Sequence, residues 1–271
     1  MTTTIGFIGG GQMAEALIRG IIQAELYTPE QILVTEPDGG RREYMEQAYG
    51  IRPFDTDLEV WDSCTSVILA VKPQVMKQVL NKARNTITSK HLLITIAAGL
   101  PISFYEAILG ERPRKIIRVM PNTPALVLEG AAALCGNDKV THEELQQAKL
   151  IFDAVGQSVI VNESAMDAVT GLSGSGPAYV FTFIEAMIDA GVKCGLTRSV
   201  ATTLTTQTVL GATRLMQESG GKHPAELRAM VTSPGGTTIA AQQVLERAGF
   251  RGIIMEAIEA AARRSNELGS R

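Results

Sequence analysis

Short apolar runs alternate with amphipathic segments through the first 163 residues of the chain. The runs are rich in branched residues and apolar on both faces, which is typical of strands covered by helices on both sides. They lie at residues 4–8, 31–36, 66–71, 92–97, 116–120 and 159–161. Helical spacing follows them, most clearly over residues 12–23 and 41–49. This alternation predicts an α/β fold, with a Rossmann-like, doubly wound parallel sheet over residues 1–163.

The pattern changes after about Glu163, where we predict no further strand. Segments with helical periodicity lie at residues 177–190, 200–216, 223–230, 237–247 and 250–268. Helices that are apolar on more than one side need a second packing partner. We therefore expect an all-helical substrate-binding and dimerisation domain over residues 164–271, which packs against its copy in another subunit.

Composition excludes several classes of function. The formal net charge is −3, with no basic block behind it, which argues against nucleic acid as a main partner. No apolar stretch reaches membrane-spanning length, and the N-terminus has no basic region or cleavage site. The three cysteines and three histidines are too scattered for a metal cluster, a disulfide framework or a hydrolytic triad. We expect a cytoplasmic protein without a metal and without a membrane partner.

The first predicted strand ends in a glycine-rich turn that fits G-x-G-x-x-A at Gly9, Gly11 and Ala14. A strand before such a turn and a helix after it are the context of a dinucleotide-binding site. Gly9 would allow the tight turn, Gly11 would let the backbone approach a pyrophosphate, and Ala14 would let the helix pack closely on the sheet. The N–H groups at the helix start, near Gln12 and Met13, would then face the phosphates.

An acidic residue, Glu36, ends the second predicted strand. A carboxylate there hydrogen-bonds the 2′-hydroxyl of the adenosine ribose and repels a 2′-phosphate, and Asp57 is a second candidate near the same ribose. Arg41 and Arg42 follow closely and could instead meet a 2′-phosphate. The sequence therefore favours NADH slightly and leaves NADPH open.

Two further turns directly follow apolar strands. The first consists of Ala70, Val71, Lys72 and Pro73, and the second of Ala97, Ala98 and Gly99. In an open α/β sheet the ligand crevice lies at the carboxyl ends of the strands. Both turns are therefore candidates to line the ribose on the nicotinamide side of the cofactor.

A second candidate site lies at the turn before the predicted helix at 237–247. Its residues are Ser233, Gly235, Gly236, Thr237 and Thr238, with Pro234 between them. One hydroxyl is enough to cap a helix, whereas this helix start has three hydroxyls and two glycines around it. Because free N–H groups at a helix start bind small anions, we expect these five residues to bind the substrate.

The start of the helical half carries chemical information of another kind. Gly171, Gly174 and Gly176 resemble the G-x-x-G-x-G-x-x-x-K signature of β-hydroxyacid dehydrogenases, in which the lysine is the acid–base group. Val180 occupies the position of that lysine. A ketone needs a proton donor at its oxygen as hydride arrives, whereas a protonated imine already carries its positive charge. The sequence therefore favours a C=N substrate over a C=O one.

Nearly the whole chain resembles the pyrroline-5-carboxylate reductases. Besides the glycine turn, the motifs that carry the resemblance lie at residues 70–73, 120–124, 171–179 and 233–238. The resemblance implies NAD(P)H-dependent reduction of 1-pyrroline-5-carboxylate to L-proline, the final step of proline biosynthesis. It also implies a homodimer with interleaved helical domains, or a ring of such dimers.

Residue roles also follow from this resemblance. The substrate carboxylate would bind backbone amides of the turn from Gly235 to Thr238, and the catalytic Thr238 hydroxyl would hydrogen-bond the ring nitrogen. Glu163 would lie beside the same pocket, and Asn122 would belong to the cofactor site. Members of the family usually carry a neutral residue where Glu36 stands, so the cofactor preference stays open.

Two alternatives remain at this stage. The first is a related oxidoreductase that acts on another imine or on a β-hydroxyacid. The second is a nucleotide-binding regulatory protein without catalysis, which would bind the cofactor but would not oxidise it when the imine is supplied.

Overall fold

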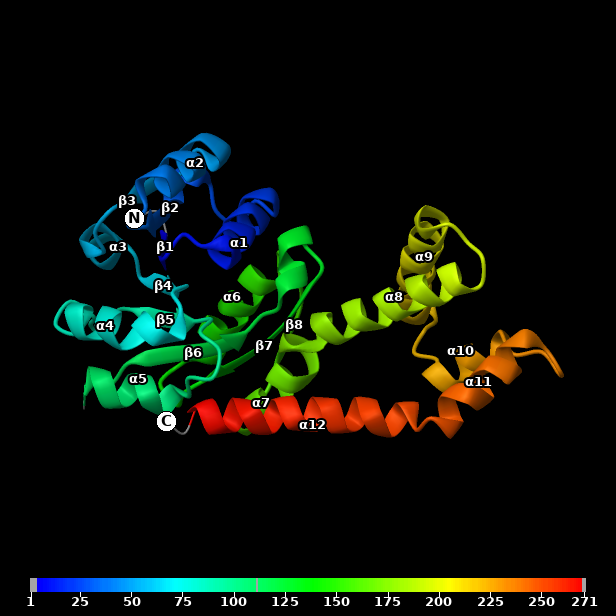
Figure 1. The fold of residues 1–271 in the computed structure, drawn as a ribbon. Coiled ribbons are helices and arrows are strands. Elements are labelled where there is room, and N and C mark those ends of the chain that lie inside the picture. The colour runs from blue at the N-terminus through cyan, green and yellow to red at the C-terminus, as the bar shows by residue number, and fades with distance from the viewer. Residues whose placement is uncertain (1–3, 111, 270–271) are drawn as a thin grey trace. The chain divides into compact units, whose positions relative to one another are not determined.

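The computed structural model describes residues 4–110 and 112–269. Contacts within the chain divide it into two compact units, each drawn in Figure 1. The sheet unit comprises Met1–Ser175 together with Ala260–Arg271, and the helical unit comprises Gly176–Glu259. This division lies twelve residues after the expected boundary at 163, because the segment after Glu163 packs on the sheet through Met166, which is fully buried.

The described residues of the sheet unit form one eight-stranded sheet in the order β3-β2-β1-β4-β5-β6-β7-β8. The strands are β1 (Ile5–Ile8), β2 (Ile32–Thr35), β3 (Arg52–Phe54), β4 (Ser66–Leu69), β5 (Leu92–Thr95), β6 (Lys115–Met120), β7 (Gly130–Gly136) and β8 (Gly156–Ile160). All neighbouring strands pair in parallel except β6 and β7. The order reverses between β1 and β4, which is where doubly wound sheets bind ligands.

Helices cover both faces of this sheet. They are α1 (Gln12–Gln23), α2 (Gly39–Tyr49), α3 (Leu58–Ser63), α4 (Pro73–Ala83), α5 (Ile102–Leu109), α6 (His142–Asp153) and the short α7 (Met166–Val169). One buried cluster joins the sheet to α1, α2 and α6 through Leu17, Met45 and Phe152. The other joins it to α3, α4 and α5 through Trp61, Leu80 and Tyr105. The predicted Rossmann-like, doubly wound fold is confirmed.

The sheet differs from the prediction in two strands. β3 was not predicted because Arg52-Pro53-Phe54 contains a proline, which a strand tolerates only at a sheet edge, and β3 is the edge strand. β7 was not predicted because Gly130–Gly136 consists mainly of alanine and glycine, which are depleted in strands. The antiparallel β7 makes the sheet mixed, whereas we expected a parallel one.

The helical unit contains α8 (Gly176–Lys193), α9 (Arg198–Glu218), α10 (Pro224–Met230), α11 (Thr237–Arg247) and the first half of α12 (Phe250–Gly269). The helix α8 packs on α9, where Gly191 faces Ala201. Ala201 and Thr205 are the only buried residues of the unit. Large apolar side chains stay exposed on its surface, including Phe181, Leu204 and Met255. As predicted, no strand follows Glu163 in the described part of the chain.

None of the helices within the described ranges combines the length and the apolar character that crossing a membrane would require.

Candidate active site

The predicted cofactor residues of the sheet unit gather at one edge of the sheet, where the parallel strands end. Glu36 follows β2, Gly9 follows β1, and Ala70 follows β4. The turn from Ala97 to Gly99 follows β5, and Asn122 follows β6. The sheet order places these strands side by side, so segments from five strands meet along one edge of the sheet. We call it the crevice edge, because ligands of open α/β sheets bind at the carboxyl ends of the strands.

The glycine turn has the geometry of a phosphate-binding loop. Gly9 has a φ of +99°, and a Cβ there would lie 2.8 Å from the carbonyl oxygen of Ala70, so no other residue fits without strain. Gly11 is the N-cap of α1, which has no side-chain cap. A Cβ placed at Gly11 would meet none of the described atoms within 4 Å. Ala14, in the first turn of α1, is fully buried. The first N–H groups of α1 are therefore open to an anion.

The side chain of Glu36 is held against this turn. Its two carboxylate oxygens accept hydrogen bonds from the backbone N–H of Gly10, at 3.0 Å, and of Asp38, at 3.1 Å. Asp38 in turn caps α2 by accepting from the backbone N–H of Arg41. These bonds fix a carboxylate at the end of β2, the position that faces the adenosine ribose in dinucleotide-binding folds.

The two arginines that follow Glu36 have partners within the sheet unit. Arg41 donates from Nε to the carbonyl of Gly10, at 2.7 Å, and forms an ion pair with Glu15. Arg42 donates from one terminal nitrogen to the carbonyls of Glu36 and Pro37, at 2.7 and 2.8 Å. Both guanidinium groups therefore support the loop around Glu36.

The other cofactor candidates have distinct environments. Lys72 is exposed and is the N-cap of α4, with Pro73 at the first helical position. Gly99 has a φ of +76°, and the Cβ of Leu268 lies 3.6 Å from the place where its own Cβ would be. Asp57 is the N-cap of the short α3 and makes no side-chain capping bond.

Asn122 connects parts of the sheet unit. Its side-chain amide donates to the carbonyl of Ser173, at 3.1 Å, and its oxygen accepts from the backbone N–H of Ala131, at 2.8 Å. The side chain thus ties the loop after β6 to the glycine-rich segment that follows α7. The amide has a second N–H and a second oxygen lone pair, so these two bonds do not prevent a direct contact with the cofactor.

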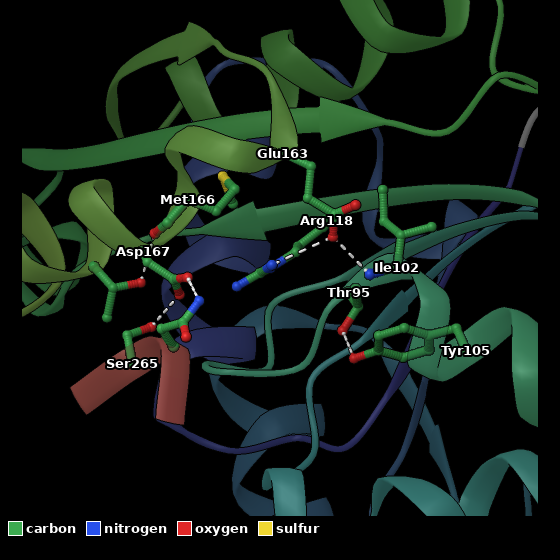
Figure 2. Close-up of polar contacts among 10 residues, drawn as sticks. Thr95, Ile102, Tyr105, Arg118, Glu163, Met166, Asp167 and Ser265 are labelled. Atoms are coloured by element: carbon green, nitrogen blue, oxygen red, sulfur yellow. Dashed lines mark hydrogen bonds and ion pairs between the residues drawn. The ribbon is translucent and has the colours of Figure 1, made fainter. Parts of the chain in front are cut away.

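Glu163 lies in a polar cluster that the sequence analysis did not anticipate. One carboxylate oxygen accepts from the backbone N–H of Ile102, at 2.7 Å, and from Arg118, at 3.3 Å (Figure 2). Ile102 is the first residue of α5, whose N-cap, Pro101, offers no side-chain oxygen. Glu163 therefore caps a helix from 61 residues away and also neutralises Arg118, which is nearly buried on β6.

Two titratable side chains lie near this cluster. Burial raises the pKa of Tyr105 to about 12, and its hydroxyl shares a short hydrogen bond with Thr95, at 2.5 Å. Burial, reinforced by the charge of Glu163, raises the pKa of Cys135 to about 11. Both groups are therefore neutral near pH 7, and Cys135 is not an activated thiolate.

The C-terminal part of α12 belongs to the sheet unit and is bonded to the segment after Glu163. Asp167 accepts from the hydroxyl of Ser265, at 2.7 Å, and from the side-chain amide of Asn266, at 3.1 Å (Figure 2). Ser265 is buried. The end of α12 thereby lies against the Gly99 turn of the crevice edge.

The predicted substrate turn lies in the helical unit. Gly235 has a φ of +65°, and the N–H of Gly236 donates to the carbonyl of Ser233, at 3.1 Å. Gly236 is the N-cap of α11, and no side chain caps this helix. The hydroxyls of Ser233, Thr237 and Thr238 therefore do not satisfy the first N–H groups, which stay open to an anion as at α1. Thr238 is half-buried, and the other two are exposed.

Val180, which stands in place of a catalytic lysine, is exposed on α8 of the helical unit. Gly171 and Gly174 belong to a short π-helical turn of the sheet unit, Thr170–Gly174. A Cβ at Gly174 would lie 2.5 Å from the terminal methyl of Met120, so this glycine allows close packing on the end of β6.

Comparisons with known proteins agree with this geometry. The family described as pyrroline-5-carboxylate reductase dimerisation matches residues 163–268. The family described as NADP oxidoreductase, coenzyme F420-dependent, matches residues 4–99. The first of these covers the predicted substrate turn, and the second covers the glycine turn and most of the crevice edge.

Curated relatives match over the full length of the chain. The pyrroline-5-carboxylate reductase of Synechocystis sp. is 47% identical, with 100% of both chains covered. That of Methanosarcina acetivorans is 47% identical, with 98% of both chains covered.

Solved structures show the same similarity. A pyrroline-5-carboxylate reductase from Coxiella burnetii superposes with a TM-score of 0.93 at 37% identity, covering 99% of both chains. The Plasmodium falciparum enzyme, solved with NADP bound, gives 0.87 at 35% identity, covering 99% of this chain and 98% of that one. With full-length relatives at this level of identity, the chain belongs to the pyrroline-5-carboxylate reductase family.

Proposed function

We propose that this protein reduces 1-pyrroline-5-carboxylate to L-proline with a reduced nicotinamide dinucleotide. The observation that carries the proposal is the uncapped start of α11, where two glycines and three hydroxyl residues surround free N–H groups. The substrate is a small carboxylate, and this is the kind of group that such a helix start binds. Membership of the reductase family supports the same assignment.

The crevice edge of the sheet unit fits the cofactor. Gly9 allows the tight turn, Gly11 leaves space for a pyrophosphate, and the first turn of α1 offers uncapped N–H groups. When bound, the reduced nicotinamide supplies a hydride. The turns from Ala70 to Pro73 and from Ala97 to Gly99 are proposed to line the ribose on that side of the cofactor.

Thr238 is the proposed catalytic residue. The backbone amides of Gly235 to Thr238, with Ser233 beside them, would hold the substrate carboxylate, and the Thr238 hydroxyl would hydrogen-bond the ring nitrogen. Hydride adds to the carbon of the protonated imine, and the electron pair of the C=N bond moves to nitrogen, giving the neutral secondary amine. Because this step requires no further proton, it is compatible with Val180 in place of a lysine.

Glu163 is proposed to support the substrate side of the site. Its bonds to the N–H of Ile102 and to Arg118 favour a positioning role, in which it holds the start of α5 near the crevice edge.

An assay of cofactor oxidation tests this function. Purified protein with pyrroline-5-carboxylate should oxidise NADH or NADPH and release proline. Cofactor binding without oxidation would instead indicate a regulatory protein, and turnover only with another imine or a β-hydroxyacid would indicate a related oxidoreductase.

Substitution of Thr238 tests the proposed mechanism. We expect Thr238→Ala to lower turnover by about one to two orders of magnitude, the loss of one oriented hydrogen bond in a transition state. Thr213→Ala is the matched control, because its hydroxyl donates only to the carbonyl of Val209 on the exposed surface of α9. Unchanged turnover in Thr238→Ala would remove this residue from the mechanism and would leave the fold and family untouched.

NADH is the proposed preferred cofactor. The carboxylate of Glu36 is held at the end of β2, and Arg41 and Arg42 are engaged by neighbouring groups. Glu36→Gln should therefore shift the ratio of kcat/KM values from NADH toward NADPH, by roughly tenfold for the loss of one charged contact. A wild-type protein that strongly prefers NADPH would contradict the role given to Glu36.

We also propose that the helical units of two chains pair in a homodimer, or in a ring built from such dimers. The dimerisation family matches this unit, and only Ala201 and Thr205 are buried within it. Exposed apolar surface of this extent marks an interaction site in a protein of this size.

A further inference from the structure

A small cavity opens at the edge of the sheet opposite the crevice. It has a volume of about 170 Å³ and lies between the end of α5, the start of β6 and the loop after β7. Three cationic side chains line it, Arg112, Arg114 and Lys139. Among the described residues that line it, Glu106 is the single carboxylate. The cavity is therefore enclosed mainly by positive charge.

Arg114 is the most unusual of these side chains. It is 5% exposed, and in the described part of the chain it has no ion-pair partner. One terminal nitrogen donates to the carbonyl of the adjacent Pro113, at 3.2 Å, while its buried Nε has no hydrogen-bond partner there. Burial, together with the neighbouring Arg112, lowers the pKa of Arg114. A buried guanidinium group in this state is unfavourable unless an anion pairs with it.

The one described carboxylate of the cavity is already engaged. Glu106 accepts from the side-chain amide of Asn137, at 3.0 Å. The same amide nitrogen of Asn137 donates to the carbonyl of Arg114, at 2.9 Å. Asn137 therefore holds Glu106 and the loop backbone in place. This neutral amide does not cancel the charge of Glu106, which offsets one of the three lining cations and leaves the lining positive.

Lys139, already counted in the lining, and Arg84 are the other cations near Arg112 and Arg114. Lys139 lines the cavity and pairs with Asp138 outside it, at 2.6 Å. The guanidinium of Arg84 approaches Gly110, where a Cβ would lie 2.8 Å from one of its nitrogens. Gly110 has a φ of +80°, so the loop can turn here and carry Arg112 and Arg114 to the same cavity.

We propose that this cavity binds a phosphate group between Arg112, Arg114 and Lys139. Guanidinium forks match the oxygens of phosphate, and a phosphate group carries nearly two negative charges at neutral pH, which suits several converging cations. The site is separate from the cofactor phosphates, because β6 begins here and the crevice lies where the parallel strands end. The ligand is free phosphate or a small phosphate monoester.

Calorimetric titration of the full-length protein with inorganic phosphate tests the proposal. Ionic strength is held constant with chloride, and saturating NAD⁺ and proline block the proposed cofactor and substrate sites. We expect saturable binding that Arg112→Gln and Arg114→Gln each weaken at least tenfold. Lys77→Gln, which removes an exposed charge from α4, should bind phosphate like the wild type. Phosphate should also raise the Tm of the wild type but not that of Arg112→Gln.

Several results would overturn the proposal. These are the absence of saturable binding, an equal loss in Lys77→Gln, or equal binding of acetate. Glu111 lies between Gly110 and Arg112 in the sequence and outside the described residues. If Glu111→Gln bound phosphate and the wild type did not, the Glu111 carboxylate would be the counterion of the arginines, and the proposal would fail. Should Arg114→Gln not fold, the exposed Arg112 decides the outcome, and titration with glycerol phosphate distinguishes an ester from the free ion.

Discussion

The sheet unit and the helical unit solve the problem of burying apolar surface in different ways. The sheet unit covers both faces of its sheet with helices and buries large side chains such as Trp61, Phe152 and Tyr105. The helical unit buries Ala201 and Thr205, and leaves Phe181 and Met255 more than half exposed. The first unit is complete within one chain, whereas the second needs another surface. One chain thus holds a unit that buries its own large apolar side chains and a unit that leaves most of them exposed.

The largest expected effect comes from a charge on the exposed apolar surface of the helical unit. Leu204→Glu on α9 should weaken self-association at least about a hundredfold, because the interface would have to bury an unpaired carboxylate. Sedimentation equilibrium measures the change in mass, and reductase activity should fall with it. Leu150→Glu is the matched control, since Leu150 on α6 and Leu204 are both 55% exposed. If Leu204→Glu remained a dimer, the exposed apolar surface around Leu204 would not be the interface, and the proposed difference between the two units would be contradicted.

A smaller effect should follow from removing Asp167 in the sheet unit. Asp167→Ala leaves the buried hydroxyl of Ser265 without its acceptor, which should lower the free energy of unfolding by about 1–3 kcal/mol. Urea denaturation measures this loss. In the helical unit, Asp189→Ala breaks an exposed pair with Arg198 and should cost at most about 1 kcal/mol. Equal losses in the two variants would contradict the view that α12 is anchored at Asp167.

The smallest effect concerns pH and is confined to the sheet unit. His91 is fully buried, and its two ring nitrogens are hydrogen-bonded to the N–H of Thr88 and the carbonyl of Trp61. Burial lowers the pKa of His91 below 6.5. The unfolded chain therefore binds this proton more readily, so stability should decline as the pH falls below about 6.5. Unfolding free energies at successive pH values measure this slope. His91→Gln should flatten it, whereas His142→Gln, at an exposed position of α6, should not.

Local patterns predicted most of the elements. The helices at 12–23 and 237–247 match α1 and α11 at both ends, and the glycine turn lies where the sequence placed it. These features depend on periodicity and turn residues within a few positions. β7 was not predicted because alanine and glycine do not favour strands, although β7 pairs with β6 and β8 in the sheet.

The contacts around Glu163 were beyond local prediction for a different reason. Its partners Ile102 and Arg118 lie 61 and 45 residues away, and no spacing rule connects such distant positions. The resemblance placed Glu163 at the site but gave no account of Arg118. The buried Arg114 was missed in the same way, since a charged residue in a loop gives no sign of burial until the fold is known.

The return of α12 to the sheet unit has a consequence for biosynthesis. Ser265 binds Asp167, and Leu268 lies beside Gly99, so residues from both sides of the helical unit complete one domain. During translation, the strands emerge long before the segment that closes their crevice edge. The nascent sheet unit must therefore wait until residues 260–268 have been synthesised before these contacts can form, so the sheet unit is completed only after the helical unit has been translated.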